Sequence, residues 1–497
     1  MTPFSPPPSS PRPRVAVVGA GICGLAAALR LAPHTDVTLF EALPDIGGVA
    51  RALSFAGHRF APGPQYLWGF EPDGAGWTAL DALGVDIDLT LLADDFEQLS
   101  VGDGPFETMR GCRPHSLLRH RLPTSARKFV DVLDALGRAG AVISHGARFR
   151  RSGVDMMHAV ARSSLAASDK AWLVRARNWS VVDLARHFDV DAAHLRRLTH
   201  AQSIFAEPLS SLSAVLYSAA RHHLKQPLAF PVGGFGAVFD AFAARLQRLG
   251  VDVRTHNRVV DVTTAGSQVR LTSVQGEQRA HLDVDDVVWA CSPTALAQLL
   301  RSSPWSSVAD GLQRRHAAAS TISSVCFSVD IAAGADRLRQ KNLSWFVDDG
   351  DVDFDVVRRR QTPQDIGALN LTSPTLNAHS LGRRQVVCAY GPAGCAPDAL
   401  VQQAMTLLRR HGVEAVVDEV MELSPTRWTR DFGAHEGVLY GRRMTAASMR
   451  RPVAPRLPPR WHLAHSGVGI PGVLGCLQLG IVTADEVMLA HAPQEPA

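Results

Sequence analysis

The stretch Arg14-Val15-Ala16-Val17-Val18-Gly19-Ala20-Gly21-Ile22-Cys23-Gly24 decides the fold. Its β-branched run over 15–18 is typical of a buried parallel strand. The alanine- and leucine-rich segment 22–31 precedes a proline and predicts a helix. Residues 37–40 (VTLF) predict a second strand. A strand, a helix and a strand in this order predict an α/β fold with a parallel sheet covered by helices.

Three glycines follow the first strand in the spacing G-x-G-x-x-G. Gly19 permits a tight turn, Gly21 lets the backbone approach a pyrophosphate, and Gly24 lets the helix pack closely on the strand. The N–H groups at the start of the helix would bind the phosphates. Glu41 ends the second strand about 20 residues later, where a carboxylate binds an adenosine ribose and repels a 2′-phosphate. The pattern predicts a dinucleotide site that disfavours NADP.

A glycine pair, Gly47-Gly48, follows four residues after that strand in the sequence Asp45-Ile46-Gly47-Gly48. Paired glycines let the chain run close beside a long ligand. Nicotinamide enzymes do not generally need this feature. Alone, the pair is also compatible with an ordinary turn; together with the first motif it favours FAD.

Later segments repeat this strand-and-helix pattern. Residues 230–235 (FPVGGF) lead into an amphipathic helix over 237–249, and residues 282–290 predict one further strand. Residues 461–464 predict another strand, followed by a glycine-rich loop and a helix that begins near 471. Aimed at a flavin, the positive end of that helix would stabilise negative charge on the reduced ring.

These motifs resemble the flavin amine-oxidase superfamily, and within it the phytoene desaturase (carotenoid desaturase) branch. The resemblance rests on Gly19–Gly24, Glu41, Gly47–Gly48, Gly63–Pro64 and residues 230–234, 259–262, 437–441, 451–452 and 465–474. It implies a Rossmann-like FAD-binding domain with an interleaved α+β substrate domain. The implied division is an FAD-binding domain from 14–72, 226–300 and 425–497, and a substrate or cap domain from 73–225 and 301–424. Residues 1–13 are rich in proline and serine, which by itself predicts a disordered tail.

The resemblance also implies which residues contact FAD. They are Gly19, Gly21, Gly24, Glu41, Gly47, Gly48, Arg51, Gly63, Pro64, Val259, Gly467, Gly469, Gly472 and Val473. The chain departs from the family pattern at Val49, where arginine is common and Arg51 would have to substitute. It departs again at Ala61, where the family has aspartate. No metal site is predicted.

The residues expected near the substrate follow the Gly63-Pro64 turn. Gln65, Tyr66 and Trp68 would line the substrate cavity, and core packing is the alternative for the two aromatic residues. No catalytic residue stands out. His465 is a candidate, either as a hydrogen-bond donor to the flavin, as an acid or base near the substrate, or as a packing residue only.

Composition limits the partners. The formal net charge of +4 over 497 residues does not predict nucleic-acid binding. Seven cysteines without a Cys-x-x-Cys pair predict reduced thiols and a cytoplasmic location. The segment 110–177 carries fourteen Lys and Arg against four Asp and Glu. That charge forms either a solvated surface or a contact with anionic lipid headgroups or an acidic substrate, so peripheral membrane contact is one expectation.

The leading hypothesis is an FAD-dependent oxidoreductase that removes a hydride from a C–H or C–N bond and introduces unsaturation. A small, hydrophobic or carrier-bound natural-product intermediate is the expected substrate, with oxygen or a quinone as electron acceptor. One alternative is a flavin-dependent isomerase or saturase without net oxidation. The other is a non-catalytic flavin-binding assembly factor, which the changes at Val49 and Ala61 keep open.

Overall fold

The structure is a computed structural model. It describes residues 12–108, 122–144, 160–191, 194–195, 198, 207–223, 225–316, 322–346, 362, 364, 366–380, 382–439, 441, 443–447, 457–468 and 471–491.

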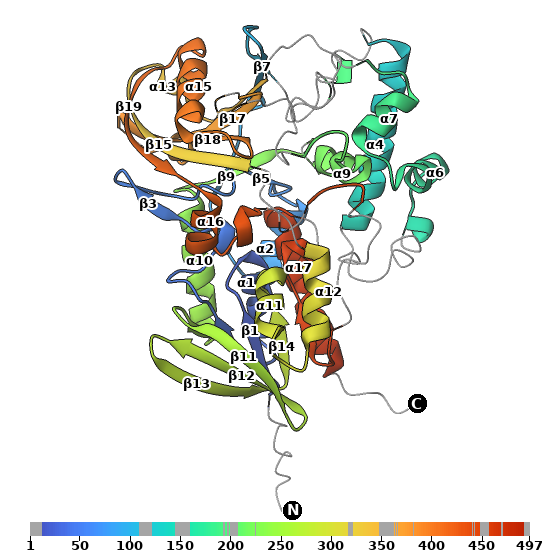
Figure 1. Ribbon diagram of the computed structural model, residues 1–497, viewed down its shortest axis with the longest axis vertical. Helices are drawn as coiled ribbons and strands as arrows, with labels where there is room; N and C mark the ends of the chain where they lie inside the picture. Colours follow the sequence, from blue (N-terminus) through green and yellow to red (C-terminus); the bar gives the residue numbers. More distant parts are fainter. Residues whose placement is uncertain are drawn as a thin grey trace, which may run out of the picture.

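The sequence motif lies in a parallel sheet in the lower half of Figure 1. Within the described residues this sheet has five strands, in the order β10 (Asp252–Arg254), β2 (Asp36–Phe40), β1 (Arg14–Val18), β14 (Asp286–Trp289) and β20 (Trp461–Leu463). Every neighbouring pair is parallel. Parallel strands buried on both faces read as continuous apolar runs, which explains why VAVV and VTLF were recognisable from sequence.

Six of the described helices pack in the same apolar core as this sheet. They are α1 (Ile22–Leu31), α2 (Ala75–Leu83), α10 (Phe235–Arg248), α11 (Pro293–Leu300), α12 (Ser306–His316) and α17 (Val473–Ala490). α17 is long and apolar enough to cross a membrane by length and composition. It packs so closely on α1 that a Cβ atom on Gly480 would lie 2.3 Å from the carbonyl oxygen of Cys23. α17 is therefore a core helix of this layer.

Short antiparallel elements join the main layers. β11 (Arg258–Ala265), β12 (Gln268–Gln275) and β13 (Gln278–Val284) form a three-stranded sheet, and β3 (Leu53–Phe55) pairs with β4 (His58–Phe60). β9 (Leu228–Pro231) lies between β5 (Leu67–Trp68) and β6 (Leu89–Leu91).

A larger, mixed sheet lies above the parallel sheet, at the upper left of Figure 1. In the described residues its order is β19 (Glu414–Glu422), β15 (Ile322–Ala333), β18 (Arg384–Pro392), β17 (Ala368–Thr372), β16 (Asn342–Phe346), β7 (Glu97–Val101) and β8 (Glu107–Thr108). Four helices belong to this part: α13 (Ala335–Leu338), α14 (Pro374–Asn377), α15 (Pro397–Arg410) and α16 (Pro425–Phe432). Buried side chains of α15 pack on one face of the sheet, which leaves the other face for the cavity described below.

A helical subdomain lies at the upper right of Figure 1. It contains α4 (Thr124–Ser144), α6 (Ala167–Ala176), α7 (Val181–His187) and α9 (Ala214–His223), which share one apolar core. Three single-turn 3₁₀ helices, Gly48–Ala50, His435–Gly437 and Ser466–Val468, complete the described elements.

The α/β architecture with interleaved sheets is confirmed, and the structure corrects one expected strand. Residues 282–290 contain the end of β13 and all of β14, which belong to different sheets. Asp285 separates them, and its carboxylate accepts a hydrogen bond from the backbone N–H of Arg14 at 2.8 Å. The domain division stays a prediction; side chains of α2 and α12 pack in the core that contains α1, although both helices were assigned to the cap. Residues 1–11 of the expected tail lie outside the described residues.

Candidate flavin site

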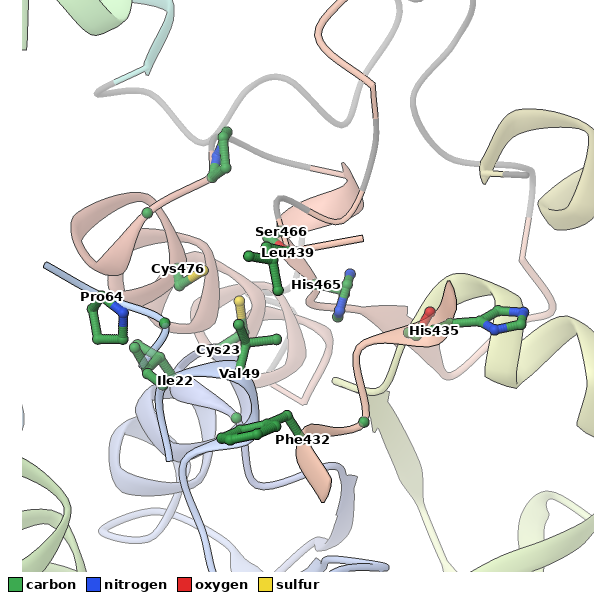
Figure 2. A pocket seen from close by; sticks show the side chains of 18 of the residues that line it. Ile22, Cys23, Val49, Pro64, Phe432, His435, Leu439, His465, Ser466 and Cys476 are labelled. Atoms are coloured by element: carbon green, nitrogen blue, oxygen red, sulfur yellow. The ribbon is translucent and has the colours of Figure 1, made fainter. Parts of the chain in front are cut away.

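A cavity of about 910 Å³ connects the sequence motif to the upper two layers. One end is lined by the turn after β1 and the end of β2, and the other by α9 and the free face of the seven-stranded sheet. Figure 2 shows side chains of the lining, among them Val49, Pro64 and His465. The volume lies at the upper end of the range of about 300–1,000 Å³ for ligand sites, as a long cofactor with a substrate beside it requires.

Two of the motif glycines, Gly24 and Gly21, take the separate roles that their spacing predicts. A Cβ atom on Gly24 would lie 1.9 Å from the carbonyl oxygen of Gly19, so only glycine lets α1 pack here. A Cβ atom on Gly21 would meet nothing within 4 Å, because this position faces the cavity. No side chain caps α1. The N–H groups of its first turn can therefore bind a phosphate at the cavity wall.

Glu41 lies at this end of the cavity and is 8% exposed. Its Oε2 accepts a hydrogen bond from the N–H of Ala20 at 2.8 Å, and its Oε1 accepts one from the N–H of Leu43 at 2.9 Å. Burial raises the pKa of Glu41, and these two donors oppose the shift. Each carboxylate oxygen can accept a further hydrogen bond, which suits the two hydroxyls of a ribose.

The glycine pair, Gly47 and Gly48, lies directly beside Gly21 of the first motif. Gly47 forms a parallel bridge with Gly21, and a Cβ atom on Gly48 would lie 3.1 Å from the Cα atom of Gly21. A Cβ atom on Gly63 would lie 2.3 Å from the carbonyl oxygen of Val49. These positions line the cavity, so three backbone segments approach one another along the space where a dinucleotide would extend.

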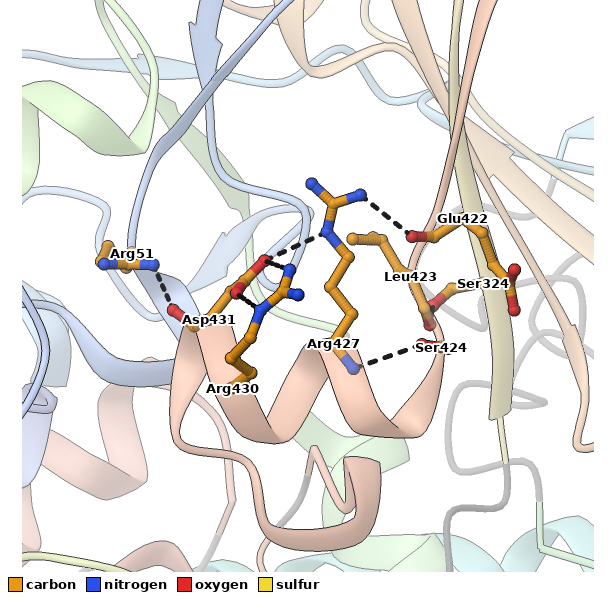
Figure 3. A network of polar contacts seen from close by, with 8 residues as sticks. All are labelled: Arg51, Ser324, Glu422, Leu423, Ser424, Arg427, Arg430 and Asp431. Atoms are coloured by element: carbon orange, nitrogen blue, oxygen red, sulfur yellow. Dashed lines mark hydrogen bonds and ion pairs between the residues drawn. The ribbon is translucent and has the colours of Figure 1, made fainter.

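The backbone of Arg51 lies against Gly47, but Arg51 is absent from the described cavity lining. Its guanidinium donates to the backbone carbonyl of Asp431 at the end of α16 (Figure 3). It also lies 3.5 Å from the carboxylate of Asp45 and 5.5 Å from the centre of the Phe432 ring. Arg51 therefore ties the glycine-pair segment to α16, and the geometry does not support its predicted contact with FAD.

Val259 lines the cavity next to Glu41, together with a residue that the sequence reasoning overlooked. Asn257 is 8% exposed, and its backbone N–H donates to the carbonyl of Glu41 at 2.8 Å. In the part of the chain that the structure describes, its Oδ1 has no hydrogen-bond partner. A buried amide without a protein partner at the adenosine end suits a ligand with polar edges. The only sequence signal was a polar residue at the start of an apolar strand.

The loop between β20 and α17 lines another part of the cavity. His465, Gly472 and Val473 line the cavity, whereas Gly467 packs behind it, where its Cβ atom would lie 2.8 Å from the carbonyl oxygen of Gly441. Gly469 lies outside the described residues. α17 begins at Val473 with no capping side chain, so its first N–H groups are available to a ligand, as the sequence predicts.

His465 is held in one tautomer. Its Nδ1 accepts a hydrogen bond from the N–H of Gly467 at 3.0 Å, which leaves Nε2 to carry the proton. Burial, assisted by the neighbouring charge of His316, lowers the pKa of His465 to about 3. A histidine that stays neutral at pH 7 is a hydrogen-bond donor and a weak base, which favours the donor role among the alternatives.

The residues after the Gly63-Pro64 turn lie as expected in the lining. Trp68 packs against Gly472, and Tyr66 packs edge-on against Phe96 with 5.6 Å between ring centres. Gln65 Nε2 donates to Asn370 Oδ1 at 3.0 Å. The two aromatic residues therefore pack in the core and line the cavity at once.

Among the described residues, the far end of the cavity is mainly apolar and includes the ion pair of Glu207 with Arg443. Lining side chains there include Leu209, Val215, Leu216, Ala219 and Met444. Glu207 also lines it, with a side chain that is 2% exposed. Both of its carboxylate oxygens accept hydrogen bonds from Arg443, at 2.8 and 2.6 Å. The guanidinium of Arg443 therefore neutralises the negative charge of the Glu207 carboxylate at the cavity wall.

Comparison with known proteins agrees with this site. The family model of flavin-containing amine oxidoreductases matches residues 22–488. The sequence matches no curated protein.

Solved structures show the same fold. A cofactor-binding double mutant of putrescine oxidase has a TM-score of 0.65 at 18% identity, with 96% of this chain and 99% of that chain covered. Wild-type putrescine oxidase bound to putrescine has a TM-score of 0.62 at 18% identity, with 96% and 99% covered. An oxidoreductase from Methanosarcina mazei has a TM-score of 0.59 at 14% identity, with 95% and 100% covered.

The described residues fit FAD. Gly21 leaves open space beside free helix N–H groups, Glu41 offers a ribose-binding carboxylate, and the cavity continues to a second free helix N-terminus at Val473. With the family match over most of the chain, the cofactor is FAD and the protein is an FAD-dependent oxidoreductase. The chain belongs to the family of flavin-containing amine oxidoreductases.

Proposed function

We propose that this enzyme oxidises a C–H bond of a small, neutral and largely apolar molecule, in the manner of the phytoene desaturase branch. FAD supplies the hydride acceptor when bound. The product would gain a double bond, because a hydride would leave one carbon for the flavin and a proton would leave the neighbouring atom for solvent. Oxygen or a quinone would be the final electron acceptor.

The observation that carries the proposal is the pairing of Glu207 with Arg443. A protonated amine needs an uncompensated negative charge when it leaves water for an apolar cavity. The described lining contains two carboxylates; Glu41 lies at the adenosine end, and Glu207 is already neutralised. The substrate end therefore favours an uncharged molecule over the diamine bound by putrescine oxidase.

The chain's own residues would position the substrate and exclude water. Apolar side chains of α9 would cover its hydrocarbon part, and Trp68 would fix the edge of the cavity at Gly472. The neutral ring of His465 carries its proton on Nε2. It would donate a hydrogen bond from there and would not act as the base that takes up the substrate's proton. The expected cytoplasmic location and peripheral membrane contact remain predictions.

Anaerobic mixing tests this proposal. FAD-loaded protein is combined with geraniol or 2-cyclohexenol, two neutral compounds with allylic C–H bonds, and separately with putrescine. We expect at least one neutral compound to bleach the yellow flavin absorbance and putrescine to leave it unchanged. Bleaching by putrescine, or no response to either neutral compound, would contradict the proposal. A change of the neutral compound without bleaching would indicate isomerisation.

A further inference from the structure

A row of uncharged polar side chains crosses the seven-stranded sheet beside the cavity. Ser344 on β16 lies opposite Asn370 on β17, and Asn370 lies opposite Tyr390 on β18. Directly opposed residues on neighbouring strands share one face of a sheet, with side chains in reach of each other. Asn370 and Tyr390 line the cavity, and Gln65 lies against them from the loop after Pro64.

The side chains of this row form a chain of hydrogen bonds in which each amide donates to the next residue. Gln65 Nε2 donates to Asn370 Oδ1 at 3.0 Å, and Asn370 Nδ2 donates to Ser344 Oγ at 3.0 Å. The hydroxyl of Tyr390 donates to the backbone carbonyl of Pro62. These bonds turn the NH₂ group of Gln65 toward the sheet. The Gln65 side chain also donates a hydrogen bond to the Tyr390 hydroxyl. Because both of these bonds use the NH₂ group, the carbonyl oxygen Oε1 is left to act as an oriented acceptor at the cavity.

This row carries no charge under ordinary conditions. Amides do not ionise, and burial raises the pKa of Tyr390 well above its usual value. A neutral acceptor recognises a hydroxyl or amide N–H, and it rejects an analogue that would leave the acceptor unpaired. The row therefore adds a polar contact to a cavity end whose α9 wall is apolar.

We propose that Gln65, held by Asn370 and Ser344, is the specificity-determining residue that accepts a hydrogen bond from a hydroxyl or amide N–H of the substrate. Gln65 contacts the substrate, and the other two are positioning residues. This inference rests on the proposed function, because it assigns the substrate class of the same site: a mostly apolar molecule with one uncharged donor near the bond that is oxidised.

Equilibrium binding to the oxidised, FAD-loaded chain tests this without turnover. The probes are N-hexylacetamide, which has one N–H, and N-hexyl-N-methylacetamide, in which a methyl group replaces that hydrogen. Binding is followed by the perturbation of the flavin spectrum. We expect the N–H compound to bind about tenfold more tightly to the wild type. Equal affinities, or no response to either probe, would overturn the proposal even if geraniol or 2-cyclohexenol bleaches the flavin.

Variants separate recognition from general damage. Gln65→Leu should bring the two probe affinities within about twofold of each other, and Ser344→Ala should reduce their ratio partly, because Asn370 loses its acceptor. Gln98→Leu is the matched control: Gln98 lies on β7 with its amide toward the carbonyl of Asp95, outside the described cavity lining. It should keep the wild-type ratio. If Gln65→Leu instead weakened FAD binding and left the probe ratio unchanged, Gln65 would contact the flavin and the proposal would be wrong.

Discussion

A Cβ atom on Gly472 would lie 2.2 Å from the Cη2 atom of Trp68. This contact fixes the start of α17 against β5 and sets the edge of the cavity. Gly472 also has φ of +96°, which disfavours any side chain. The two residues are 404 positions apart by subtraction of their numbers, so the contact belongs to the fold and not to a local motif.

Gly472→Ala should therefore destabilise the protein by about 1–3 kcal/mol through overpacking, in addition to about 1 kcal/mol for the positive φ. The measurement is the free energy of unfolding in urea. Gly57→Ala is the control, because Gly57 has φ of +80° and nothing within 4 Å of its Cβ position. Equal losses for the two variants would mean that the contact with Trp68 does not constrain α17.

Arg443→Met should change which ligands bind. Without Arg443, the carboxylate of Glu207 stays buried and uncompensated, so a cation becomes its best partner. We expect putrescine to perturb the flavin spectrum of this variant and not of the wild type. The double variant Glu207→Gln/Arg443→Met should again ignore putrescine. Putrescine binding to the wild type would show that the ion pair does not neutralise the cavity.

His465 should not titrate near neutral pH. Because its pKa is about 3, the ring stays neutral from pH 5 to 8, with the proton on Nε2. Nitrogen NMR of the ¹⁵N-histidine-labelled protein measures the pKa of the ring and shows which nitrogen carries the proton. The His465→Asn variant assigns the signals. A titration of this ring near the ordinary value of about 6.5 would contradict its buried, hydrogen-bonded state.

Glu97 should make stability depend on pH. It is fully buried on β7, and burial raises its pKa to about 8. Since its unfolded pKa lies near 4.5, the unfolded chain loses this proton first, and stability falls as pH rises from about 4.5 to 8. Glu97→Gln removes this contribution, so it should stabilise the protein more at pH 8 than at pH 5 in urea unfolding. An equal effect at both pH values would show that Glu97 ionises normally in the folded state.

The dinucleotide end of the site could be predicted from sequence because its chemistry is local. The strand, the three glycines and the helix occupy residues 14–31, and Glu41 follows at a fixed spacing. Gly472 and Val473 were also predictable, since a glycine-rich loop before an apolar helix indicates a helix N-terminus.

The substrate end could not be predicted in the same way. Glu207 and Arg443 meet across 236 residues, and neither lies in a motif. Ser344, Asn370 and Tyr390 form a row only because of the strand register, which single-sequence patterns do not fix. Arg51 was assigned to FAD by resemblance alone, and its interaction with Asp431 depends on where α16 packs.

Titration of FAD into the apoprotein tests the central claim most directly. The account predicts that the wild-type chain binds one FAD and that Glu41→Gln binds it about 10–100-fold more weakly, because the amide cannot replace both acceptor oxygens of the buried carboxylate. Asp45→Asn, at an exposed carboxylate nearby, should bind FAD like the wild type. A correctly folded chain that takes up no FAD, or a Glu41→Gln variant with unchanged affinity, would contradict the account.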